Sequence, residues 1–111
     1  MRKAILLPFE IGKDNNLKYT AAMELAKENS LPLICFTTIP PKSSDADIDE
    51  VYLHLLLLNG FYQMQNDAES STKKVAVKRI IKKGSFEEQL HLFIKNSPLE
   101  LILFQWEEGE A

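Results

Sequence analysis

Short apolar runs alternate with longer amphipathic stretches along this chain. The first apolar run, residues 3–10 (KAILLPFE), has no period-2 alternation and meets Pro8 near its end. Such a run is too short for a helix and is typical of a strand buried on both faces of a parallel sheet. Further strands are predicted over residues 33–39, 75–81 and 99–106.

Helical patterns separate these strands. The first predicted helix covers residues 16–29, and Asp14, Asn15 or Asn16 can serve as its N-cap. Its apolar residues recur at helical spacing on one narrow stripe, which predicts a single face against the sheet. The residues of that stripe are Leu17, Ala21, Ala22, Leu25 and Ala26.

The second predicted helix, residues 48–66, has two apolar stripes instead of one. A helix on the surface of a domain needs only one apolar face, so we expect the second stripe to meet something other than the core. The first stripe consists of Ile48, Val51, Tyr52, Leu55, Leu58 and Tyr62, and the second of Leu53, Leu57, Phe61 and Met64.

The third predicted helix follows Gly84 and ends at residues 96–98. Ser85 and Glu88 have the spacing of a capping box, in which the two side chains satisfy each other's free amides. The same helix N-terminus lies beside two lysines and could instead bind an anion. Glu88 competes for those amides, which favours the cap.

The predicted strand over residues 75–81 is surrounded by cations. Lys73, Lys74, Lys78, Arg79, Lys82 and Lys83 occur there without an acidic residue among them. Lysines protect exposed sheet edges from pairing, so we interpret this strand as an edge. The alternative is an anion or nucleic-acid patch. The absence of interleaved aromatic residues and the acidic balance of the chain favour the edge.

Composition and charge narrow the class of protein. A chain of 111 residues with a net charge of −3 fits one globular domain, residues 1–111, and argues against general nucleic-acid binding. Its single cysteine, Cys35, excludes an internal disulfide and is expected to be a small buried apolar residue. Without a signal peptide or a long apolar segment, we expect a soluble, cytoplasmic protein that does not enter a membrane.

Four strands alternating with three helices predict an α/β domain with a mainly parallel sheet. Its opening run, and the stretch from Gly84 through residues 99–103, are similar to the universal stress protein family, a Rossmann-like fold. This resemblance implies a four-stranded sheet of order 3-2-1-4. It covers nearly the whole chain, without the family's fourth helix and fifth strand.

The resemblance also implies a nucleotide site that this chain has lost. In nucleotide-binding members an aspartate follows the first strand, and here Glu10 stands in its place. A glycine-rich turn normally wraps the phosphates after the fourth strand, but Gln105 and Glu108 stand where its first two glycines would fall. Only Gly109 remains of that turn, and the neighbouring glutamates would repel phosphate. We therefore expect no cofactor and no ATP binding.

Two functions stay open. The first, which we prefer, is a non-catalytic stress-protein-like module that acts in stress response or protein interaction, as a homodimer or with a protein partner. The second is a binder of a small ligand or adenine nucleotide at the strand C-termini, where Glu10, Asp14, Asn15 and Thr38 would lie. An enzyme has little support, because the acidic residues and histidines form no recognisable acid–base pair.

A homodimer is predicted from the last strand, which would be an edge with apolar residues on both sides and no protective lysine. Two copies would pair these strands antiparallel, and the second stripe of residues 48–66 would help to cover the bare face of the sheet. The expected interface residues are Leu99, Leu101, Ile102, Leu103, Phe104 and Trp106, with Leu53, Leu57 and Phe61. A monomer whose loops cover that surface is the alternative.

Overall fold

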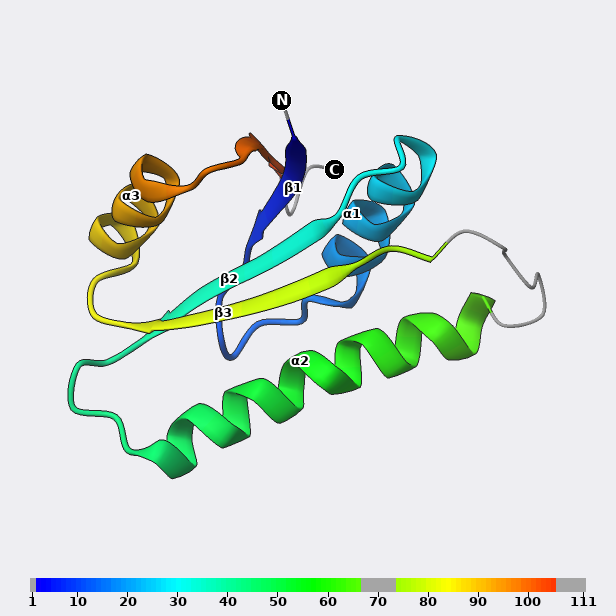
Figure 1. Ribbon diagram of the computed structural model, residues 1–111. Coiled ribbons are helices and arrows are strands. Elements are labelled where there is room, and N and C mark those ends of the chain that lie inside the picture. The colour runs from blue at the N-terminus through cyan, green and yellow to red at the C-terminus, as the bar shows by residue number, and fades with distance from the viewer. Residues whose placement is uncertain (1, 67–73, 106–111) are drawn as a thin grey trace, which may run out of the picture.

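A computed structural model describes residues 2–66 and 74–105 of the protein (Figure 1). Its strands pair in the order β3-β2-β1-β4, and all three pairings are parallel. The predicted α/β fold with its 3-2-1-4 sheet is therefore confirmed. In chain order the elements are β1 (Lys3–Pro8), α1 (Asn16–Glu28), β2 (Leu33–Ile39), α2 (Asp45–Asn66), β3 (Val77–Lys83), α3 (Phe86–Asn96) and β4 (Glu100–Leu103).

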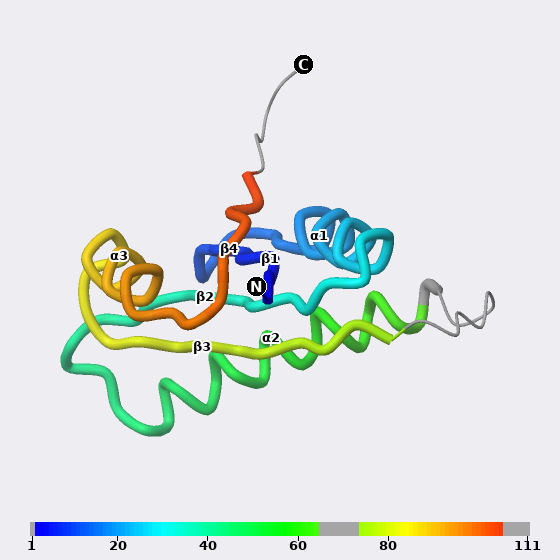
Figure 2. The backbone as a smooth tube through the Cα atoms, turned by 45° about the horizontal axis from the view of Figure 1, so that its top comes forward, coloured from blue at the N-terminus to red at the C-terminus, as the bar shows by residue number. Residues whose placement is uncertain are grey.

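The central strand β1 is buried on both faces of the sheet, as its unbroken apolar run predicts. Ile5 and Leu7 belong to a larger core cluster that includes side chains of α1 and α2. Ala4 and Leu6 belong to a smaller cluster, against which α3 packs. Helices α1 and α2 thus cover one face of the sheet, and α3 covers the other. Figure 2 shows in addition that α3 and α1 lie toward opposite ends of the sheet.

The face that α1 turns to the core differs from the predicted stripe. Leu17 is 74% exposed and Leu25 is 36% exposed, whereas Tyr19 and Met23 are buried. The Tyr19 ring packs edge to face on Tyr62 with centroids 6.1 Å apart, and its hydroxyl donates a hydrogen bond of 2.6 Å to Asn59. Burial of this large aromatic ring, with its hydroxyl hydrogen-bonded, stabilises the fold more than burial of the two leucines would.

Helix α2 begins at Asp45, three residues before the predicted start. The Ser44 amide donates to the Asp47 carboxylate at 2.8 Å, and the Asp47 amide donates to the Ser44 hydroxyl at 3.2 Å. This reciprocal pair is a capping box in which aspartate takes the place of glutamate, and it fixes the helix start. Within the first predicted stripe, Tyr52 is an error, because it is 43% exposed while Val51, Leu55, Leu58 and Tyr62 are buried.

The capping box expected at α3 is not formed. Ser85 is the N-cap residue, but its side chain makes no cap hydrogen bond. Its carbonyl accepts the Gln89 amide at 3.0 Å, and the Gln89 side chain lies against Gly84, where a Cβ atom would crowd it. Gly84 also has a φ of +132°, a conformation that side chains rarely adopt.

The bounds of β3 and β4 also differ from the prediction. β3 covers Val77–Lys83 instead of residues 75–81, and β4 covers Glu100–Leu103 instead of residues 99–106. Phe104 continues the ladder with one more hydrogen bond, from its amide to the Leu6 carbonyl at 2.8 Å. Trp106 lies outside the described residues.

Candidate functional site

The carboxyl ends of the four parallel strands meet at one end of the sheet. The chain moves from β1 to β2 and β3 on one side, then returns to place β4 on the other side of β1. In open α/β sheets this switch point between β1 and β4 is where ligands usually bind. A hollow of about 280 Å³ lies there, lined by Pro8, Phe9, Glu10, Lys18, Phe86, Leu103, Phe104 and Gln105.

Of the four predicted ligand residues, only Glu10 lines this hollow. Its carboxylate forms an ion pair of 3.0 Å with Lys13, three residues later in the same loop. Both side chains are more than half exposed, so the pair contributes little to stability and leaves the carboxylate in water. A carboxylate in that position repels an anionic ligand.

Asp14 and Asn15 shape the loop between β1 and α1. The Asp14 carboxylate accepts the Asn16 amide at 3.0 Å. Asn15 is buried, and its amide nitrogen donates to the carbonyls of Glu10 at 3.1 Å and Lys13 at 3.0 Å. Its side-chain oxygen is buried too and has no hydrogen-bond partner within the described part of the chain. Both residues thus fix the turn that carries Glu10.

Thr38 is half-buried on β2, paired in register with Lys82 of β3, on the sheet face that α3 covers. The threonine that joins β2 to the end of β1 is its neighbour Thr37. Thr37 is buried, and its hydroxyl donates to the Phe9 carbonyl at 2.9 Å. Strand alternation places Thr37 and Thr38 on opposite faces, so a one-residue difference decides which of them reaches β1.

Sequence reasoning missed Lys18 and Phe86, which bring a cation and an aromatic ring to the hollow. Lys18 belongs to the first turn of α1, and Phe86 is the first residue of α3. The signal for both was available, because helix N-termini lie at the same end of the sheet as the strand C-termini in a βαβ unit.

Groups that could perform chemistry are dispersed. Across residues 2–66 and 74–105, no three His, Cys, Asp or Glu side chains gather closely enough to hold a metal ion. His54 is half-buried on α2 and His91 is exposed on α3, the helix on the other face of the sheet. Neither histidine lines the hollow, whose ionisable lining residues are Glu10 and Lys18.

The buried nucleophiles belong to the core. Burial raises the pKa of the Cys35 thiol from 9.0 to about 12, although the nearby Arg79 lowers it. Burial is also the largest cause that raises the pKa of the Tyr19 phenol. Cys35 is 1% exposed, so it acts as a small apolar residue, as predicted.

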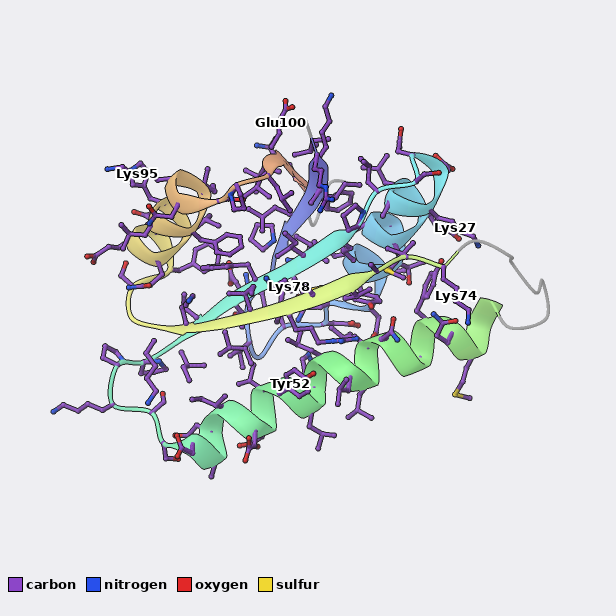
Figure 3. All side chains as sticks on the ribbon, viewed as in Figure 1. Lys27, Tyr52, Lys74, Lys78, Lys95 and Glu100 are labelled. Carbon is purple, nitrogen blue, oxygen red and sulfur yellow. The ribbon has the colours of Figure 1, made fainter. Side chains whose placement is uncertain are left out.

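A second candidate site is the outer face of α2, opposite the core. Six large apolar side chains are between 41% and 80% exposed on this one helix. We call this set the outer α2 face; it consists of Tyr52, Leu53, Leu56, Leu57, Phe61 and Met64. Figure 3 shows α2 along the rim of the molecule, with side chains that project away from the sheet.

The strand β4 leaves a smaller apolar surface. Leu99 and Leu101 are half-buried and pack on the α3 side, while Phe104 packs against the larger cluster. Among the described apolar residues of this predicted interface strand, only Ile102 (39%) and Leu103 (43%) are exposed.

The chain was compared with protein families, curated proteins and solved structures. No family model matches the chain, and no curated protein matches it. Among solved structures it is similar to the universal stress protein UspA from Lactobacillus plantarum, with 13% identity over 95% of this chain and 99% of that chain and a TM-score of 0.46. At that identity and score the likeness concerns the fold, and no functional argument depends on it. No helix within the described ranges is long and apolar enough to cross a membrane.

Proposed function

We propose that this protein is a non-catalytic, universal stress protein-like module that works by association, as a homodimer, and does not bind ATP. The observation that supports it is the outer α2 face. Apolar patches of this size are uncommon on monomeric proteins and mark interaction sites. The surface belongs to one rigid helix, so it is already formed before a partner arrives.

The size of the surface suits a second copy. A fully exposed aromatic side chain contributes roughly 200 Å², and the six residues are about half exposed on average. Each copy then offers on the order of 500 Å² of apolar area, and two copies would bury on the order of 1,000 Å², the lower limit for a stable interface. A two-fold dimer uses the same patch on both copies and needs no other surface.

Charge sets the orientation of the two helices. All four acidic residues of α2 lie in its first six positions, at Asp45, Asp47, Asp49 and Glu50, and the helix has no lysine or arginine. Parallel packing would bring these acids together, whereas antiparallel packing places each acidic end beside the uncharged end of the other helix. Antiparallel helix dipoles also attract. The proposed dimer therefore has antiparallel α2 helices.

The centre of the outer α2 face has a shape that fits this packing. Leu53, Leu57 and Phe61 form a ridge at spacing i, i+4 and i+8, and Gly60 beside it has open space where a Cβ would stand. A hollow of about 600 Å³ surrounds this glycine and is bordered by Leu57, Phe61 and Met64. The ridge of one copy can enter the hollow of the other.

A sedimentation experiment tests the proposal. At micromolar concentration the protein should be a dimer, and Leu57→Lys should convert it to a folded monomer, because a charge would be buried in an apolar interface. Ile94→Lys is the matched control, since Ile94 is 43% exposed on α3, which covers the other face of the sheet. It adds the same charge and should leave the dimer intact.

The earlier strand-pairing hypothesis gives the opposite result. If the dimer forms through β4, then Ile102→Lys dissociates it and Leu57→Lys does not. A wild-type protein that stays monomeric at high micromolar concentration would reject both forms of the dimer.

A second candidate function is binding of a small ligand at the switch point. The observation that favours it is the hollow of about 280 Å³, which is lined by Lys18 and three phenylalanines. Its volume suits only a compact ligand, and Glu10 disfavours a phosphate. Ligand-induced thermal stabilisation that Lys18→Ala abolishes would support this function.

A further inference from the structure

We propose that the outer edge of β3 binds an extended acidic segment of another protein, which joins the sheet as an additional strand. This interaction goes beyond the proposed function and does not depend on the outer α2 face. It combines three observations: a strand with one open side, uncompensated lysines along it, and a groove beside it.

The open side follows from the sheet order. β3 pairs with β2 in parallel over its whole length, from the Val77–Leu33 pair to the Lys83–Ile39 pair. On its other side, no strand pairs with it within residues 2–66 and 74–105. Its outward N–H and C=O groups are therefore available to an added strand, which is a common mode of peptide recognition.

Two lysines of this edge project from the same face of the sheet. Lys78 pairs in register with Ile34, and Lys82 with Thr38, so both project from the face of the sheet that α3 covers. Both lysines are exposed. Among the described residues, neither has a carboxylate within the 4.0 Å of an ion pair. An added strand with acidic residues at positions i and i+4 would place each carboxylate beside one lysine.

A groove between α3 and β3 receives those carboxylates. It measures about 300 Å³ and is lined by Lys78 and Lys82 together with the amide side chains of Gln89 and Asn96. Its apolar lining includes Ile34 and Phe93. Lysine and amide N–H groups are donors, so the polar wall suits an acceptor such as a carboxylate.

The side chains on the other face of β3 determine which residues the added strand should carry at its remaining positions. Val77, Arg79 and Ile81 lie on that face, and Val77 and Ile81 are partly buried against the larger core cluster. The neighbours of Val77 and Ile81 on an added strand should be apolar, because cross-strand apolar pairs stabilise a sheet. The preferred segment therefore alternates apolar residues on one face with acidic residues on the other.

The same lysines discriminate against two other partners. A second copy would bring its own lysine-rich β3 edge, and like charges placed opposite each other are destabilising. Single-stranded nucleic acid binds through aromatic stacking as well as charge, and β3 has no aromatic residue. An acidic peptide satisfies both the backbone and the lysines.

The test uses isotope-labelled protein and a blocked nine-residue peptide with the central sequence Val-Glu-Thr-Thr-Val-Glu, which in a parallel register places its valines beside Val77 and Ile81 and its glutamates beside Lys78 and Lys82. We expect saturable amide shift changes in β3 and at the groove. Lys78→Glu and Lys82→Glu should each weaken binding about fivefold, because a favourable charge pair becomes a repulsive one. Lys95→Glu is the matched control, since Lys95 is exposed on α3 and does not line the groove. It should change the affinity less than twofold.

Two further probes separate strand addition from general attraction of anions. A peptide with N-methyl groups on the alternate amides that face β3 keeps its charge but loses its ladder donors, and it should not bind. If it binds as well as the parent peptide, the proposal is wrong. Equal weakening by Lys95→Glu, or tighter binding of an oligonucleotide of equal charge at the same amides, would also overturn it. Spectra of each variant show whether the fold is intact.

Discussion

The two faces of the sheet are packed to different depths. On the face of α1 and α2, both helices contribute buried side chains, among them Tyr19, Leu55 and Tyr62. On the other face, the buried residues all come from β1 and β2, and α3 has no buried residue. Its ring contacts are made by half-buried side chains, such as Phe93, whose centroid is 5.3 Å from that of Phe36.

This difference shows how strand order distributes a core. Right-handed connections from β1 to β2 and from β2 to β3 place two helices on one face, while the return to β4 places one on the other. We call the face of α1 and α2 the deep face and the face of α3 the shallow face. On the deep face, α2 keeps apolar side chains that lie outside the core, and on the shallow face a groove remains beside β3. Both proposed interaction surfaces result from this unequal division.

The largest expected effect compares one core residue from each face. Leu55→Ala should lower the free energy of unfolding by about 2–5 kcal/mol, because Leu55 is 1% exposed and its loss creates a cavity. Phe93→Ala removes more atoms but from a half-buried position, so we expect less than about 3 kcal/mol. Urea denaturation measures both. A larger loss for Phe93→Ala would mean that the shallow face is the main support of the fold.

Alkaline pH should destabilise the deep face selectively. The pKa of Cys35 is raised from 9.0 to about 12 by burial, so the thiol ionises first in the unfolded chain. The stabilisation is complete below pH 9 and is lost as the pH rises towards 12. The raised pKa of Tyr19 acts in the same direction. Cys35→Ala should flatten the decline in unfolding free energy between pH 9 and 11, and an unchanged slope would contradict this assignment.

Removing the N-cap serines of α2 and α3 should give a smaller difference in stability. Ser44→Ala removes a side-chain bond at the start of α2 and should cost about 1 kcal/mol. Ser85→Ala removes no cap hydrogen bond and should cost well below 1 kcal/mol. Both serines are exposed, so the two substitutions are well matched. Denaturant melts that give equal losses would show that Ser85 caps α3 in solution.

The smallest expected effect is that of ATP at the switch point between β1 and β4. A ligand at one hundred times its dissociation constant stabilises a protein by about 2.7 kcal/mol. Millimolar Mg-ATP should leave the melting temperature almost unchanged, because the hollow of about 280 Å³ is small for a nucleotide and no glycine among its lining residues exposes backbone amides to the phosphates. A reproducible rise of several degrees that Glu10→Gln alters would instead favour the ligand-binding function.

The sequence was most informative where the burial of apolar side chains alone determines the structure. The unbroken apolar run of β1 predicts burial on both faces, and the doubled apolar stripes of α2 predict an exposed second face. The orientation of α1 could not be predicted, because the choice between Leu17 and Tyr19 depends on Asn59 and Tyr62, which are distant in sequence. The start of α2 was missed although Ser44 and Asp47 have the capping-box spacing.

The candidate site was less predictable than the fold. The strand order correctly indicated the end of the sheet at which Glu10 lies. It could not indicate that Asn15 would fold back onto loop carbonyls, or that Thr37 and not Thr38 would reach β1. Such details depend on loop conformation and on strand register at single-residue precision.

The position of β1 between β2 and β4 also affects how the chain folds. β1 meets β2 after one helix, but Lys3 pairs with Glu100 only when three helices have been made. At ordinary rates of synthesis, this interval is on the order of ten seconds. During that time one backbone edge of an apolar strand stays unpaired, and pairings so distant in sequence form slowly. We therefore expect a nascent chain of this protein to be prone to association through β1 until β4 has been made.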